Sequence, residues 1–214
     1  DKKNLVPVKE GYRGAARIEI EDPDVMRRQA AERAKQPAPT LTVPRLTGPA
    51  PAGHVERVDW TQATSVRLST HPRGWQVNRH AELRFLHDGQ YLYLNILDQC
   101  DERSLSLMTP FKGDRWELAW AASAKAPVHV LGIMPTGVIE ERVLGTDKAI
   151  KSTAKVRCDV EPHLWRVSAA IPLKALGGRQ VLFNVARGTI ACDLRPIVWA
   201  PAFSDAYHDA RHMG

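Results

Sequence analysis

The sequence predicts an all-β protein, an antiparallel β-sandwich of the jelly-roll or immunoglobulin-like type, preceded by a short strand-helix segment and a proline-rich linker. From Val58 onward, short apolar stretches alternate with polar residues, turn residues separate them, and helical periodicity is nearly absent. Side chains on a strand point alternately to the two faces, so this alternation indicates strands with one buried face. Many short strands at near-regular spacing are typical of a sandwich.

Residues 1–53 form the predicted N-terminal extension. Ala16–Ile20 alternates and predicts a short strand, and Asp22 followed by Pro23 is a helix-start signal for a polar helix that reaches Lys35. Residues 37–53 contain five prolines, which predicts an extended linker. We therefore expect a domain boundary here, with the sandwich domain at 54–214.

The predicted strands of this domain are separated by turn signals such as His87–Gln90. A single helical turn is expected at Pro172–Leu176. The strands are Ser65–Leu68, Ala81–Leu86, Tyr91–Asp98, Trp116–Trp120, Val128–Met134, Ile139–Leu144, Ala154–Cys158, Leu164–Ile171, Val181–Ala186 and Thr189–Cys192.

Composition limits the classes of function. The net charge of +6 comes from scattered side chains, so we expect no nucleic-acid partner. No apolar run approaches the ~20 residues that span a membrane, and no catalytic motif is present, so we do not expect an enzyme. The chain begins at Asp1 without Met, which indicates a processed or excised product. Its three cysteines form no metal-binding CxxC pair. A Cys158–Cys192 disulfide is one open pairing.

The stretch Phe111–Trp120 is the main candidate for a ligand site. Trp116, Leu118 and Trp120 share one strand parity, and Glu117 falls on the other. Phe111 stands just before the turn that opens this strand. An aromatic ring can cover the apolar face of a sugar while a carboxylate accepts its hydroxyl protons. The alternative interpretation is an ordinary core strand after a polar turn.

The order of motifs along residues 55–214 resembles the family 9 carbohydrate-binding modules and their family 9-like and DOMON-like relatives. The motifs are Asp59-Trp60, the turn and strand at 87–94, Pro-Phe-Lys-Gly-Asp-Arg-Trp-Glu at 110–117, the tryptophan strand and proline turn at 165–177, Phe-Asn-Val-Ala-Arg at 183–187 and Val-Trp-Ala-Pro at 198–201. The resemblance implies a non-catalytic accessory domain of a secreted or periplasmic protein that binds the end of a glycan.

In the sugar-binding members of that family, two aromatic side chains clamp a terminal sugar. The resemblance places Phe111 and Trp199 at those two positions, with phenylalanine where the family has tryptophan. It assigns the hydrogen-bonding glutamate to Glu117.

Four further residues are candidates by the same resemblance. Asp114 matches the aspartate of the turn, and Arg187 matches a recurrent arginine, for which ligand binding and bracing of the sandwich are both open. The strand after Glu117 lacks the family's arginine and asparagine and offers only His129. No metal site is assigned; Asp98 and Asp101 are loose candidates for a structural calcium.

Two alternatives to sugar binding stay open at this point. Relatives of this sandwich bind haem b for electron transfer, and Met108 and Met134 are available as ligands, although no second ligand is evident. The third interpretation is a ligand-free assembly domain that contacts other domains or subunits of a larger protein.

The remaining aromatic and histidine residues carry separate expectations. Trp60, Trp116 and Trp165 are expected in the core, while Trp75 and Trp199 could be exposed or buried. His208 and His212, four residues apart, are expected in a solvated tail.

Overall fold

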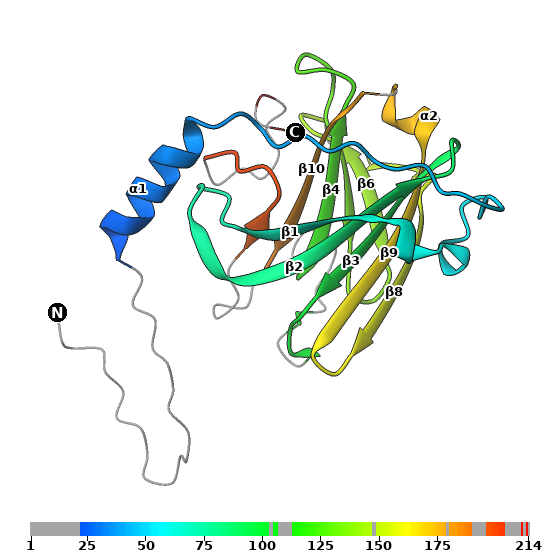
Figure 1. Ribbon diagram of the computed structural model, residues 1–214, viewed down its shortest axis with the longest axis horizontal. Helices are drawn as coiled ribbons and strands as arrows, with labels where there is room; N and C mark the ends of the chain where they lie inside the picture. The colour runs from blue at the N-terminus through cyan, green and yellow to red at the C-terminus, as the bar shows by residue number, and fades with distance from the viewer. Residues whose placement is uncertain are drawn as a thin grey trace, which may run out of the picture.

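The computed structural model confirms an all-β protein built on antiparallel strands (Figure 1). It describes residues 22–102, 105–106, 113–146, 149–178, 180–189, 196–203, 211 and 213. In this part of the chain, eleven strands form one curled sheet in the order β7-β6-β5-β4-β10-β11-β1-β2-β3-β9-β8.

The strand bounds agree with the predicted alternation to within a few residues at most ends. They are β1 Thr64–Thr70, β2 Gln76–His87, β3 Tyr91–Asp98, β4 Arg115–Ala121, β5 His129–Ile133, β6 Ile139–Val143, β7 Ala149–Ile150, β8 Lys155–Glu161, β9 Leu164–Pro172, β10 Leu182–Gly188 and β11 Ile197–Val198.

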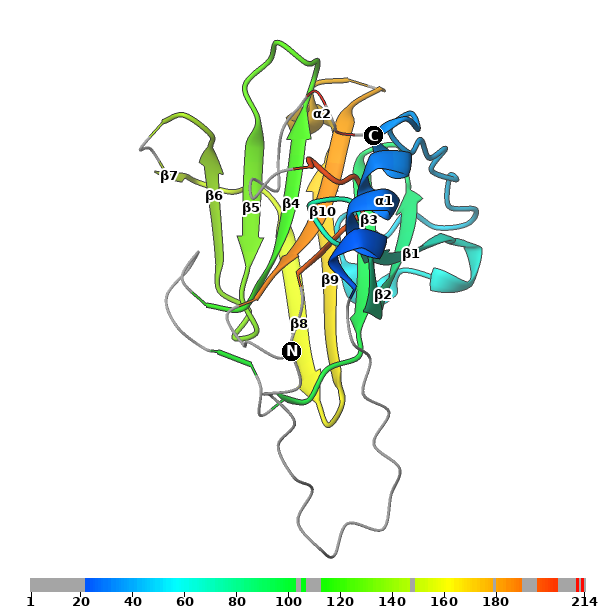
Figure 2. The same cartoon turned by 90° about the vertical axis from the view of Figure 1, so that its left-hand side faces the viewer.

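The sheet curls so that its two halves face each other. Figure 2 shows β6, β5, β4 and β10 side by side, with β8 and β9 passing behind them. The short strand β11 joins the halves, because it pairs with β10 through Ala186–Val198 and with β1 through Thr70–Val198. The predicted sandwich is therefore formed by one continuous sheet.

Aromatic side chains fill the space between the halves. The ring centroids of Trp116 on β4 and Trp165 on β9 lie 6.4 Å apart, and both side chains are fully buried. Phe85 on β2 meets Phe183 on β10 edge to face at 6.2 Å. The core expectation is confirmed for Trp116 and Trp165.

Two predicted helical segments are confirmed. Helix α1 covers Pro23–Ala34, and the side chain of Asp22 caps it by accepting a hydrogen bond from the backbone N–H of Asp24 at 2.8 Å. No residue of α1 is buried. Helix α2 covers Leu173–Leu176 and ends at Gly177, whose φ of +84° suits glycine.

The proline-rich linker lies against the sheet. Leu41 and Val43 pack on the main core, and Arg45 forms a parallel bridge to His87 at the end of β2. The Gly53 N–H donates to the Tyr93 hydroxyl at 2.9 Å, and that hydroxyl donates to Asp88 at 2.6 Å. The linker is thus held in its middle and at its C-terminal end, while the division of the chain at residue 53 stays a prediction.

Some strand predictions need correction or lie outside the described residues. Strands β7 and β11, each of only two residues, are not among the predicted strands. Thr189 follows β10 and is not in a strand, and the rest of the predicted strand Thr189–Cys192 is not described. The predicted strand Ala16–Ile20, His208 and His212 also lie outside the described residues.

No helix in the described ranges is long and apolar enough to cross a membrane.

Candidate functional site

The structure distributes the residues predicted for sugar binding over several places. Phe111 lies outside the described residues. Asp114 and Arg187 meet in the interior, where Arg187 Nη1 donates to Asp114 at 2.9 Å and neither side chain is exposed. Arg187 Nε also donates to Asp98 at 2.9 Å. These buried carboxylates and the guanidinium therefore connect β3, the start of β4 and β10.

Asp98 is part of this ionic network, and its two arginine partners argue against a role as a calcium ligand. Arg79 Nη2 donates to one carboxylate oxygen of Asp98 at 2.6 Å, and Arg187 Nε donates to the other oxygen. A carboxylate held by two guanidinium groups is a poor cation ligand, since a cation would have to displace them. Within the described ranges, no group of three or more His, Cys, Asp or Glu side chains could hold a metal ion.

Glu117 lies on the opposite face of β4. Its cross-strand neighbours are Ala186 on β10 and Gly132 on β5, and Arg115 Nε donates to its carboxylate. Glu117 is buried. Farther along the same face, Met213 packs on Ala119 and Val130.

His129 and Trp199 lie elsewhere again. His129 stacks on Trp120 with ring centroids 5.5 Å apart, and its Nδ1 lies 3.3 Å from Glu141. Trp199 is only 8% exposed and contacts Phe85 with ring centroids 5.8 Å apart. Of the predicted set, only Asp114 and Arg187 are brought into mutual contact among the described residues.

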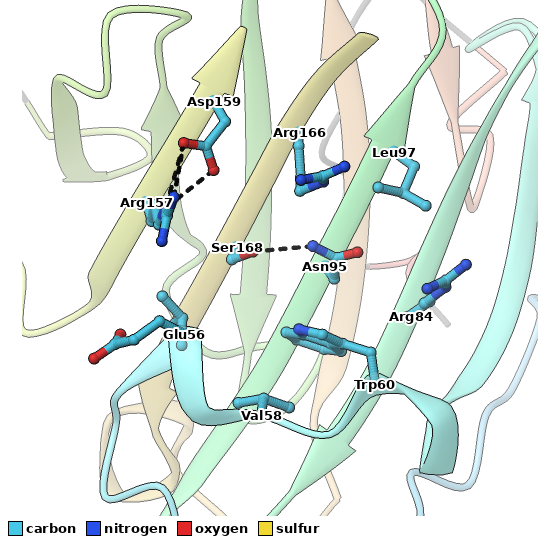
Figure 3. Close-up of a pocket in the computed structure, with 11 residues that line it drawn as sticks. Glu56, Val58, Trp60, Arg84, Asn95, Leu97, Arg157, Asp159, Arg166 and Ser168 are labelled. Carbon is cyan, nitrogen blue, oxygen red and sulfur yellow. Dashed lines mark hydrogen bonds and ion pairs between the residues drawn. The ribbon is translucent and has the colours of Figure 1, made fainter. Parts of the chain in front are cut away.

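A groove of about 360 Å³ lies on the outer face of the other half of the sheet. We call it the Trp60 groove. Its floor is formed by β8, β9, β3 and β2, and its rim by the short 3₁₀ helices Val55–Arg57 and Trp60–Gln62. Figure 3 shows the Trp60 ring between Val58 and Asn95. It is lined by Val55, Glu56, Val58, Trp60, Arg84, Asn95, Leu97, Arg157, Asp159, Arg166 and Ser168.

Local sequence explains how Trp60 is held at this rim. The side chain of Asp59 caps the turn by accepting from the Thr61 N–H at 3.1 Å. The indole packs on a small apolar cluster that includes Val58, Leu86 and Tyr93, and it stays partly exposed. This corrects the expectation that Trp60 is a core residue: it packs against the sheet on one side only.

The floor of the groove carries two hydrogen-bonding groups with capacity to spare. Asn95 Nδ2 donates to Ser168 Oγ at 2.9 Å, as Figure 3 also shows. Asn95 is 4% exposed and Ser168 7%. Within the described part of the chain, neither the carbonyl oxygen of Asn95 nor the hydroxyl proton of Ser168 has a partner. One acceptor and one donor are thus available to a ligand.

Arginines surround these two groups. Arg84 on β2 lies opposite Asn95, and Arg166 on β9 lies opposite Leu97, so they flank β3 on its two sides. Arg84 Nε donates to Glu82 at 2.7 Å and lowers the pKa of that carboxyl group. Arg157 on β8 is held by Asp159 through both Nε and Nη2.

The groove is not predicted by the sequence motifs. Asn95 and Ser168 interrupt apolar strands. Each follows an apolar residue, Leu94 or Val167, and so points to the opposite face of its strand, which indicates the outward face. That signal was available, but it does not show that the two residues are neighbours. Their contact depends on the register of β3 against β9, which pairs Asn95 with Ser168.

Comparison with solved structures identifies proteins of the same architecture. A family 9 carbohydrate-binding module from Caldicellulosiruptor kristjanssonii, in complex with glucose, matches with a TM-score of 0.57 and 15% identity over 79% of this chain and 92% of that chain. The chain has the fold of a family 9 carbohydrate-binding module. This agrees with the resemblance found in the sequence.

Two further structures support the same fold. A family 9 module of the same organism with cellotriose matches with a TM-score of 0.58 and 14% identity, over 80% of this chain and 90% of that chain. A proposed carbohydrate-binding protein from Bacteroides uniformis ATCC 8492 matches with a TM-score of 0.58 and 12% identity, over 81% and 96%. No protein-family profile and no curated protein sequence matches the chain.

Proposed function

We propose that the chain is a non-catalytic carbohydrate-binding domain whose ligand lies in the Trp60 groove. The observation that carries this proposal is the partly exposed indole beside the Asn95 carbonyl and the Ser168 hydroxyl, both without a partner within the described ranges. An indole face and a paired acceptor and donor are the groups that a pyranose ring requires. The fold shared with carbohydrate-binding modules supports the same function.

The width of the groove suits an oligosaccharide. Its floor spans four neighbouring strands, β8, β9, β3 and β2. At about 4.8 Å between adjacent strands, the three intervals give a floor about 14 Å wide. A ligand lying across the strands would meet Ser168 and Asn95 near the centre and Trp60 at the rim.

The clamp formed by Phe111 and Trp199, with Glu117 as hydrogen-bonding partner, stays a separate prediction. Trp199 packs beside Phe85 in the core and has little surface to offer to a ligand. Arg187 and Asp114 form a buried ion pair, so we assign them a structural role in this proposal. We retain the expectation that the domain is an accessory part of an extracytoplasmic protein.

Titration with a panel of cello-, xylo- and galacto-oligosaccharides, followed by calorimetry, tests this function. Trp60→Ala should weaken binding about tenfold, because an aromatic stacking contact contributes about 0.5–1.5 kcal/mol beyond the area that it buries. Trp75→Ala is the matched control, since Trp75 is also partly exposed but stacks on His71 outside the groove. Equal loss in both variants, or no binding by the wild type to any sugar, would contradict the proposal.

The same purified protein can be used to distinguish the other two interpretations, a haem-binding domain and a ligand-free assembly domain. The haem alternative depends on Met108, which lies outside the described residues, and on Met134, which is buried at the end of β5. An absorbance band typical of haem in the purified protein would favour it. A colourless protein that binds no glycan would favour the assembly domain.

A further inference from the structure

We propose that the ligand of the Trp60 groove is an acidic glycan, and that its carboxylate or sulfate group binds between Arg84 and Arg166. This inference rests on the proposed function and specifies the chemical class of the sugar. It follows from three properties of the groove: the position of these arginines, their unused hydrogen-bond donors and the balance of charge.

The two arginines reach the same part of the floor from opposite sides. Arg84 pairs with Asn95 across the β2–β3 ladder, and Arg166 pairs with Leu97 across the β3–β9 ladder. Both point outward on the sheet face that carries Asn95 and Ser168, and Figure 3 shows Leu97 between them. Their strands are two intervals apart, about 10 Å, and their positions differ by two residues along the strands, about 7 Å, so the backbones lie about 12 Å apart, which two long side chains can bridge by converging on one anion.

Each of these arginines uses only part of its donor set. Arg84 donates to Glu82 through Nε, and Arg166 contacts Glu161 through Nη1 at 3.4 Å. Their other guanidinium N–H groups have no partner among the described residues. A guanidinium group presents five donors in a planar fork that fits the oxygens of a carboxylate or sulfate.

Arg157 provides an internal comparison. Its Nε and Nη2 both donate to Asp159, so its fork is already filled by a carboxylate of the protein. The same geometry is open at Arg84 and Arg166. Their ion pairs are also weakly held, since the arginine side chains are 33% and 40% exposed and exposed pairs contribute little. A ligand can therefore replace Glu82 or Glu161 at small cost.

The charges lining the groove favour an anion. Among the lining residues, Arg84, Arg157 and Arg166 carry three positive charges and Glu56 and Asp159 two negative ones. Glu82 and Glu161, just outside the lining, pair with Arg84 and Arg166, and an incoming anion takes their place. The whole chain carries a net charge of +6. An anionic sugar would be attracted both by the groove and by the protein as a whole.

Matched ligands and matched variants test this inference. One ligand pair is a trigalacturonate and its fully methyl-esterified form, which keeps the sugars and removes the charge. The other is a sulfated galactan oligosaccharide and its desulfated form. Arg84→Gln and Arg166→Gln remove one groove cation each, and Arg67→Gln, on the neighbouring strand β1 outside the groove, removes the same charge elsewhere.

We expect at least one acidic ligand to bind about tenfold or more tightly than its neutral form, because hydrogen bonds to charged groups are the stronger ones. This preference should disappear in Arg84→Gln and Arg166→Gln and persist in Arg67→Gln. Preference for trigalacturonate identifies a carboxylate ligand, and preference for the sulfated oligosaccharide identifies a sulfate ligand.

The outcomes separate this inference from the proposed function. If neutral and acidic forms bind equally and Trp60→Ala weakens both, the carbohydrate function stands and the anionic specificity is refuted. If Arg84→Gln and Arg166→Gln weaken both forms by the same factor, the arginines act structurally and the inference is also refuted. If no sugar of either kind binds in a Trp60-dependent way, the proposed function itself is refuted.

Discussion

Replacing Arg187 by methionine should destabilise the fold strongly. Arg187 has no exposed surface, donates to Asp98 and Asp114, and places its guanidinium 4.7 Å from the centre of the Trp165 ring. With Arg79, these four side chains carry two positive and two negative charges. Methionine fills a similar volume but leaves one buried negative charge without compensation.

The expected cost follows from what each carboxylate retains. Asp98 keeps Arg79 as a partner at 2.6 Å, whereas Asp114 keeps the backbone N–H of Ser106, also at 2.6 Å. Breaking a buried ion pair from one side costs about 3–5 kcal/mol. We expect a value in that range for Arg187→Met, because Asp114 is left buried with a neutral donor only.

Urea unfolding followed by tryptophan fluorescence and circular dichroism measures this loss. Arg67→Met, at an exposed arginine on β1, is the control and should change stability by no more than about 0.5 kcal/mol. Combining Arg187→Met with Asp114→Asn should cost less than the sum of the single changes, since the second change removes the orphaned charge. A loss below about 1 kcal/mol in Arg187→Met, or strict additivity, would refute the reasoning.

Two further predictions address the core and its thiols. Trp199→Ala should lower the free energy of unfolding by about 3–5 kcal/mol, because the ring packs against Phe85, and the folded variant should bind sugar like the wild type; a stable variant that no longer binds would instead support Trp199 as a clamp residue. Burial raises the pKa of the Cys100 and Cys158 thiols to about 11 from an ordinary value of 9.0. Because the unfolded chain loses these protons at lower pH than the folded chain, the thiols' contribution to stability is complete below about pH 9 and should be lost as the pH rises towards 11. Urea unfolding across that pH range measures this loss, with Cys100→Ser and Cys158→Ser as controls. A free energy of unfolding that does not change with pH in the wild type would contradict the prediction.

Most strands were readable from the sequence because apolar side chains alternate with polar or small ones along them. In β4, Trp116, Leu118 and Trp120 alternate with Arg115 and Glu117, and the structure places these three in the core, with Trp116 beside Trp165. The short strands β7 and β11 were not predicted, because a two-residue strand is too short to show an alternation of apolar and polar side chains. Helix α1 was predicted from its cap and not from an apolar stripe, which agrees with its having no buried residue.

The site was less predictable, for a reason of geometry. Parity states which face a side chain takes, but register decides which side chains meet. Asp114 and Arg187 are 73 positions apart and Asp98 and Arg187 are 89 apart, yet they form one network. In the same way, nothing local connects Trp60 with Asn95 or Ser168. Their assembly into a groove depends on how β2, β3, β9 and β8 align.

The position of β11 has a consequence for folding during synthesis on the ribosome. This two-residue strand is the element that joins β10 to β1, and it pairs Thr70 with Val198 across more than half of the chain. While residue 197 is still being synthesised, β1 and β10 each present an open edge, and such edges can pair with other chains. The sheet can close only after Ile197 and Val198 have left the exit tunnel. The two halves of the nascent chain therefore stay unjoined until β11 emerges, and this is the step at which the two edges are removed from pairing with other chains.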